Sequence, residues 1–138
     1  MSMYDKPLPV PDEDTKEFWD GCRRHKLLVQ RCPQCGYYCF PPYPMCPKCQ
    51  SVERCWVEVS GRGKVYSWAI VHRPAHPAFT KDAPYALVLI ELNEQQDLRM
   101  LGNIVDCDIA DIRADMPVEV LFDDVTEEIT LPKWKLVR

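Results

Sequence analysis

The feature that most constrains this chain is a dense run of cysteines in its first half. The segment "RCPQCGYYCFPPYPMCPKCQS", residues 31–51, holds five of the eight cysteines in the 138-residue chain. Four of them form two identical pairs, Cys32/Cys35 and Cys46/Cys49, spaced C-x2-C-x10-C-x2-C. Two intervening residues let both thiolates of a pair turn toward one ion, and two pairs complete a tetrahedral shell of sulfurs. The spacing therefore predicts a bound metal.

The expected metal is Zn²⁺, with iron less favoured, because four thiolates suit both ions. Four protein ligands leave no position for water or substrate, so the site is expected to be structural. Such a site contributes on the order of 10 kcal/mol to folding, enough to hold a ribbon with almost no core. Gly36 follows the first pair and adopts a positive φ easily, whereas Gln50 at the matching place has less freedom.

Catalytic machinery is not evident in the sequence. There is no G-x-S-x-G, no phosphate-cradling glycine loop and no H-E-x-x-H. A reactive thiolate needs a positive neighbour, and "CRRH" offers only Cys22 near His25. We interpret Cys39 as a packing or exposed thiol, and the isolated Cys22, Cys55 and Cys107 as buried small apolar residues. We therefore predict no catalytic residue.

Charge is unevenly distributed along the chain. Residues 21–73 carry nine Lys/Arg against two Glu, while residues 1–20 sum to −4 and residues 74–138 to −7. This basic island, residues 21–73, is either a solvated surface that balances its neighbours or an anion-binding face for phosphates or a nucleic-acid backbone.

The N-terminal stretch bears on the compartment. "MSMYDKPLPVPDEDTKEFWD" is acidic and lacks an apolar core, unlike a secretory signal. No apolar run approaches the roughly 20 residues of a membrane helix. We expect no membrane association and a reducing cytoplasm, where clustered cysteines are more often metal ligands than disulfides.

The pattern of expected helices and strands divides the chain into three segments. Residues 1–30 read as a proline-containing arm and a helix through "TKEFWDGCRRHK", capped by Asp12 or Asp14 and interrupted at Gly21. Residues 31–54 form the metal ribbon. Residues 55–138 contain about five substantive strands, which predicts a small closed barrel. These begin with "RCWVEVSGRGKVYSWAIVHRP" as strand, turn and strand, and end in a hairpin from "PVEVLFDDV" to "EITLPKWKLV".

The order of these parts resembles a known two-domain family over roughly residues 12–136. The motifs that carry the resemblance are "CFPP", "GRGKVYS" and "APY". The family joins a rubredoxin-like zinc ribbon to an OB-fold and was once labelled a domain of unknown function. The resemblance implies a mainly β fold: an N-terminal helix and zinc ribbon, then a five-stranded OB-fold barrel. The chain departs from the family at "NEQQD" and at Asp115, where members often carry glycine.

The resemblance also implies a function. Family members are similar to accessory subunits of acyl-CoA enzymes, among them thiolases, hydratases and aldolases, whose catalytic residues lie in the partner chain. We therefore expect a non-catalytic subunit that scaffolds a thiolase-like catalytic subunit and helps bind a CoA thioester. Arg62 and Lys64, flanking Gly63 in a predicted turn, and Arg73 further along are the expected phosphate contacts. Alternatively, these three are solvated turn residues.

A second hypothesis is a module for single-stranded nucleic acid. OB-folds and zinc ribbons commonly bind single strands through a basic groove and aromatic platforms, and Tyr66 and Trp68 could stack on bases. The acidic barrel half and a pI of about 5.4 oppose it, because such binding rests on phosphate neutralisation. We therefore favour the acyl-CoA hypothesis. The sequence leaves open which acyl group is handled and the stoichiometry of the complex.

Overall fold

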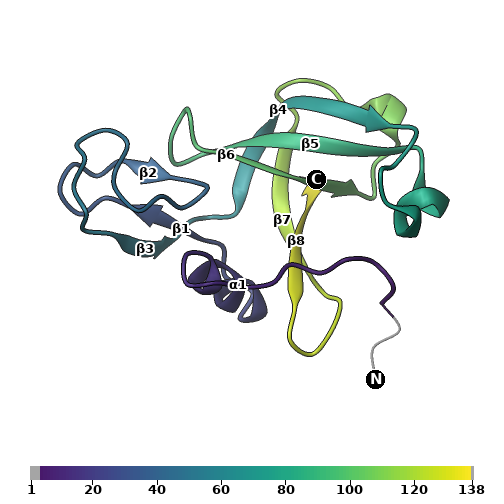
Figure 1. The fold of residues 1–138 in the computed structure, drawn as a ribbon. Helices are drawn as coiled ribbons and strands as arrows, with labels where there is room; N and C mark the ends of the chain where they lie inside the picture. The colour runs from purple at the N-terminus through teal and green to yellow at the C-terminus, as the bar shows by residue number, and fades with distance from the viewer. Residues whose placement is uncertain (1–3, 138) are drawn as a thin grey trace.

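A computed structural model describes residues 4–137, so residues 1–3 of the predicted arm and Arg138 lie outside the described part. Figure 1 shows a small ribbon lobe beside a larger barrel, with helix α1 (Lys16–Arg23) where the two meet. The chain is mainly β, as the sequence predicts. Among the described residues, no helix has the length and apolar character needed to cross a membrane.

The ribbon lobe is built on a three-stranded antiparallel sheet in the order β2-β1-β3. Its strands are β1 (Leu28–Arg31), β2 (Tyr38–Cys39) and β3 (Cys55–Glu58). The sequence grouped β3 with the barrel, and the pairing of β3 with β1 corrects this. Alternating Val and polar residues predict a strand but not its partner, which here comes from before the metal site.

The barrel closes with five strands in the order β4-β5-β6-β8-β7, confirming the predicted number. The strands are β4 (Arg62–Val71), β5 (Tyr85–Leu92), β6 (Arg99–Val105), β7 (Pro117–Asp124) and β8 (Thr130–Leu136). Short 3₁₀ helices fill two crossovers, η1 (Pro77–Asp82) and η2 (Ile109–Asp111). β4 pairs with β5 from Gly63 to Val71 and, on its other edge, with β7 over Arg62–Lys64, and a register shift between Val65 and Ser67 interrupts its pairing with β5.

One hydrophobic core runs through both lobes. Inside the barrel, β5 buries every second residue, as period-two alternation requires, and the indole of Trp134 is 1% exposed. The core continues through Leu27 and Val29 to Phe18 and Cys22 on α1. Apolar side chains of the helix therefore pack between the ribbon and the barrel.

Helix α1 passes through Gly21 instead of breaking there, which corrects the prediction. A Cβ at Gly21 would lie 2.8 Å from Leu28 Cγ, so the glycine permits close packing of the helix on β1. The helix ends at Arg23; beyond its cap, His25 has φ of +59°, and the amide of Lys26 donates to the Gly21 carbonyl at 2.8 Å. At the other end the N-cap is Thr15, without a side-chain capping bond, which corrects the predicted cap at Asp12 or Asp14. The Asp12 carboxylate instead accepts from the amides of Asp14 and Thr15 in the turn before the helix.

Candidate metal centre and ribbon–barrel junction

The four predicted ligands converge at the tip of the ribbon. The sulfurs of Cys32, Cys35, Cys46 and Cys49 all lie within 4.8 Å of one another. Cys32 Sγ is 3.5 Å from Cys49 Sγ, and Cys35 Sγ is 3.6 Å from Cys46 Sγ. A tetrahedral ion with bonds of about 2.3 Å places its sulfurs about 3.8 Å apart. The donor set therefore fits one Zn²⁺, and the same four thiolates would also accept iron.

The two cysteine turns have the same backbone geometry. The amide of Gly36 donates to the Cys32 carbonyl at 2.9 Å, and that of Gln50 donates to the Cys46 carbonyl at 2.9 Å. Gly36 has φ of +79° and Gln50 has φ of +65°. Gln50 therefore takes the left-handed conformation that its position requires although it is not glycine.

Backbone amides and neighbouring sulfurs shift the pKa values of the thiols at this site. Backbone amides, led by that of Cys49, lower the pKa of Cys46 to about 6. At Cys49 the amide of Ser51 favours the thiolate, but the neighbouring sulfurs, Cys32 first among them, raise the pKa to about 12. Four thiolates this close need a cation among them, which agrees with a metal centre.

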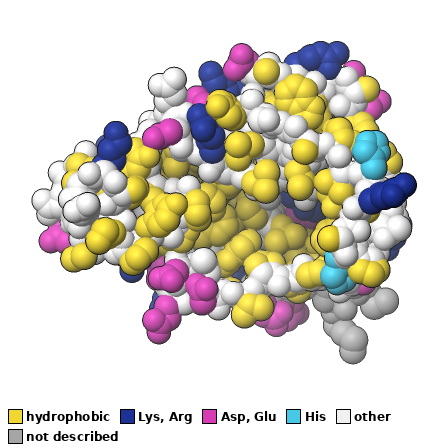
Figure 2. All heavy atoms as spheres, turned by 45° about the horizontal axis from the view of Figure 1, so that its top comes forward, with side chains coloured by type: hydrophobic (Ala, Val, Ile, Leu, Met, Phe, Trp, Pro, Cys, Tyr) yellow, Lys and Arg dark blue, Asp and Glu magenta, His cyan; other side chains and the backbone are white. Residues whose placement is uncertain are grey.

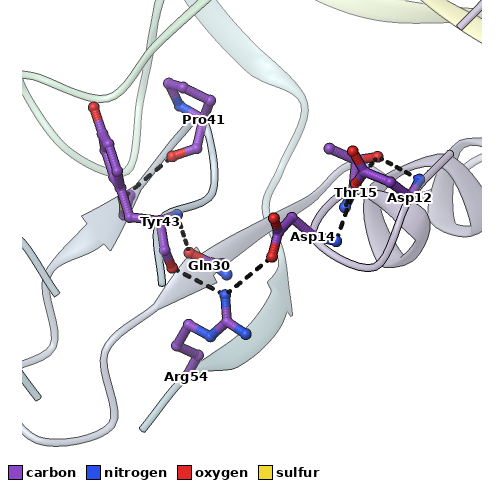
Figure 3. A network of polar contacts seen from close by, with 8 residues as sticks. Asp12, Asp14, Thr15, Gln30, Pro41, Tyr43 and Arg54 are labelled. Atoms are coloured by element: carbon purple, nitrogen blue, oxygen red, sulfur yellow. Dashed lines mark hydrogen bonds and ion pairs between the residues drawn. The ribbon is translucent and has the colours of Figure 1, made fainter. Parts of the chain in front are cut away.

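The proline-rich loop between the cysteine pairs is anchored from two sides, as Figure 3 shows. The side chain of Gln30 on β1 accepts from the amide of Tyr43 at 3.0 Å. Arg54 donates to the Tyr43 carbonyl at 3.0 Å and approaches Asp14, before α1, at 4.0 Å. These contacts fix the loop to β1 and, through Arg54, to the segment before α1.

Side chains of the "NEQQD" turn between β5 and β6 form hydrogen bonds that join the ribbon to the barrel. The Gln95 side chain accepts from the Tyr38 amide at 2.9 Å and donates to the Tyr38 carbonyl at 2.8 Å. The Tyr37 hydroxyl donates to Asp97 at 2.6 Å, and Glu94 accepts from the amide of Ser60 at 2.7 Å. Sequence reasoning saw this segment only as a turn, although its amide and carboxylate side chains were a signal of polar contacts.

The three expected phosphate contacts do not form one cluster. Arg62 and Lys64 project from the same face of β4, and each has an acidic neighbour: Glu119 at 3.6 Å and Asp115 at 3.6 Å. Arg73 follows the far end of β4, nine residues beyond Lys64. Gly63 is not in a turn, which corrects the sequence interpretation; a Cβ there would collide with the Glu91 carbonyl, so β5 makes the close approach.

Cys22 and His25, the thiol and imidazole that the sequence places near each other, do not form a catalytic pair. Cys55 is exposed, which corrects the prediction that it is buried. Cys22 is fully buried, and burial raises its pKa to about 12. His25 turns away from it, lying 3.0 Å from Asp124 and stacking on Phe122. The Thr130 hydroxyl donates to Asp124 and not to His25, so it is not activated by the imidazole.

Exposed apolar side chains gather on two parts of the surface. On the ribbon they are Tyr43, Met45 and Val52, and on the barrel they are Tyr66, Trp68 and Leu101. Figure 2 shows hydrophobic side chains spread across a hollow in the middle of one face. Such apolar surface is typical of a protein that binds another chain.

Comparison with known proteins relates both parts of the chain to one family. Residues 19–53 match the ChsH2 rubredoxin-like zinc ribbon domain, and residues 56–123 match the ChsH2 C-terminal OB-fold domain. A DUF35 domain-containing scaffold protein of Methanocaldococcus jannaschii is 41% identical over 106 residues, covering 76% of this chain and 73% of that protein.

Two further similarities involve proteins named for acyl-CoA or aldolase chemistry. A probable enoyl-CoA hydratase alpha subunit of Thermomonospora curvata is 35% identical over 94% of this chain, but the chain spans only 40% of that protein. A solved structure titled Ltp2-ChsH2(DUF35) aldolase superposes with a TM-score of 0.83 at 34% identity, covering 94% of this chain and 98% of that one. The chain therefore belongs to the DUF35 family, in which a rubredoxin-like zinc ribbon precedes an OB-fold.

Proposed function

We propose that this chain is a non-catalytic accessory subunit that scaffolds a thiolase-type acyl-CoA enzyme and helps hold its CoA thioester. The observation that carries the proposal is the closed four-cysteine centre, which leaves a metal no open position for substrate. Cys22 is buried with a raised pKa and His25 pairs with Asp124, so the thiol and imidazole that the sequence places near each other are not a nucleophile and its base. We therefore expect the chain to act by binding another protein.

The names of the relatives support an acyl-CoA partner. They include a hydratase alpha subunit, an aldolase complex and scaffold proteins. The thiolase type rests on the order of motifs across residues 12–136. One such protein that the chain resembles is the small subunit of a benzoylsuccinyl-CoA thiolase, so we include that enzyme as a specific partner to test.

Arg62, Lys64 and Arg73 are the proposed contacts for CoA phosphates. Arg62 and Lys64 could act together, since their side chains share a face and are 60% and 48% exposed. Arg73 stands apart and would meet a different phosphate. In titrations of the assembled complex with CoA, Arg62→Ala with Lys64→Ala should weaken binding about tenfold, whereas Lys26→Ala, an exposed change elsewhere in the basic island, should not. Equal effects would refute the assignment.

The proposed function is tested by identifying what the chain binds. The tagged chain is expressed in its native host, purified, and its companions are identified by mass spectrometry. We expect a stoichiometric thiolase-like chain and no thioester turnover by the isolated protein. Nucleic acid as the companion, or turnover by the isolated chain, would contradict the proposal.

A further inference from the structure

One edge of β4 is unpaired over much of its length. On one side β4 pairs with β5 along its length, from Gly63 to Val71. On its other side it pairs with β7 only over Arg62–Lys64, and a last contact joins Val65 to the segment before β7. Within residues 4–137, no strand pairs with that edge over residues 66–71.

Apart from the register shift at its start, this free edge, residues 66–71, lacks the protection that natural sheet edges carry. Its sequence, "YSWAIV", has no charged residue, no proline and no glycine. Tyr66 is 48% exposed and Trp68 is 39% exposed, and the neighbouring Ser67 and Ala69 are exposed as well. Proteins normally block such edges with lysine, proline or a covering segment, because unpaired backbone groups attract another strand.

The charges at the two ends of the edge indicate what pairs with it. Lys64 precedes the edge and Arg73 follows it. Antiparallel pairing with a second copy, centred on Trp68, would place Lys64 of one chain opposite His72 of the other, with Arg73 next to them. Two such pairs would gather positive charges at both ends, and like charges repel. A partner strand that is uncharged in the middle and acidic at its ends would instead complement both.

We infer that the free edge of β4 is a docking site at which an extended segment of the catalytic subunit adds a strand to the barrel. The inference rests on the proposed function. The segment is uncharged over about six residues and carries acidic residues at its ends. Main-chain hydrogen bonds supply affinity in such pairing, and alternate side chains supply specificity, here against Tyr66 and Trp68.

Hydrogen exchange tests the inference on the complex isolated from the native host. In the isolated chain, those amides of residues 66–71 that face away from β5 should exchange quickly. In the complex their exchange should slow at least tenfold. If a catalytic subunit is bound and these rates are unchanged, the inference fails and the proposed function stands. If no acyl-CoA enzyme is bound, both fail.

Two lysine substitutions separate the edge from the neighbouring sheet face. Ala69→Lys places a charge on the exposed edge and should reduce the recovered partner at least tenfold. Leu89→Lys is the matched control, because Leu89 on β5 pairs with Ser67 of β4 on one side and with Leu101 of β6 on the other, and so has no free edge. Loss of partner with Leu89→Lys alone would overturn the inference. So would dimers of the isolated chain that protect residues 66–71.

Discussion

At the scale of single residues, this chain adopts left-handed backbone at positions that are not glycine. Gln50 in the second cysteine turn and Asp115 before β7 have φ of +65° and +67°. A left-handed conformation costs a non-glycine residue about 1–2 kcal/mol. Asp115 also pairs with Lys64, and its amide donates to the Val65 carbonyl at 2.8 Å. The backbone turn is thus imposed by its surroundings.

Substitution at the two cysteine turns should have opposite effects. Gly36→Ala should lower the free energy of unfolding by about 1 kcal/mol, because the left-handed conformation disfavours a Cβ although space exists for it. Gln50→Gly should be neutral or stabilising by a similar amount. Urea unfolding of the metal-loaded protein measures both. If both variants lost equal stability, the turns would not be equivalent.

The contact between Tyr37 and Asp97 should make stability depend on pH. The hydrogen bond from Tyr37 lowers the pKa of Asp97 and raises that of Tyr37 to about 12. Its contribution is therefore present above the ordinary carboxyl value of 3.8 and is lost as pH falls through the lowered value. At high pH it persists up to the ordinary tyrosine value of 10.0 and is lost through about 12.

Tyr37→Phe should accordingly lower Tm between about pH 5 and pH 9, and its difference from the wild type should shrink in stronger acid. Tyr38→Phe is the control, since its hydroxyl does not bond Asp97. Melting curves across this pH range provide the measurement. A difference in Tm that is the same at all pH values would mean that packing of the ring, not the hydrogen bond, carries the effect.

At the scale of elements, the turn joining β5 to β6 fixes the ribbon on the barrel. Gln95→Ala removes two hydrogen bonds to Tyr38 and should cost about 1–3 kcal/mol. The amide of Tyr38 should also exchange faster. Gln96→Ala, an exposed neighbour in the same turn, should change neither quantity. An unaltered Tyr38 amide in the Gln95 variant would show that the ribbon is held by other contacts.

The elements also show how far the sequence predicts the fold. Cysteine spacing places all four ligands, because metal chemistry restricts it closely. Alternating hydrophobicity predicts the number of barrel strands and the closing hairpin. It does not predict that β3 pairs with β1, or that Gln95 reaches β2, because pairing across lobes leaves no local pattern. Gly21 and Gly63 were misread for the same reason: each permits the approach of a segment distant in sequence.

At the scale of the whole molecule, we expect the ribbon tip to depend on a metal for its fold and the barrel not to. Between residues 31 and 54 only Cys32, Cys39 and Cys46 are buried. The barrel instead has an apolar core around Trp134. The metal site therefore replaces a core in the ribbon, where its contribution to folding is on the order of 10 kcal/mol.

Removing one metal ligand should therefore unfold the ribbon tip and leave the barrel folded. Cys46→Ser should lose the metal and the exchange protection of residues 32–51, while the amides of β5 stay protected. Cys55→Ser, which changes an exposed thiol outside the cluster, should keep both. Metal analysis and hydrogen exchange on the same samples provide the comparison. Persistent protection of the ribbon without metal would contradict a structural role.

The central claim is that this chain assists catalysis without performing it. Its most direct test measures thioester turnover by the purified catalytic subunit alone, by this chain alone, and by the two mixed at increasing ratios. We expect no turnover by this chain, weak turnover by the partner, and a rise that saturates at a fixed stoichiometry. Turnover by this chain alone, or a partner whose rate is unaffected by it, would contradict the claim.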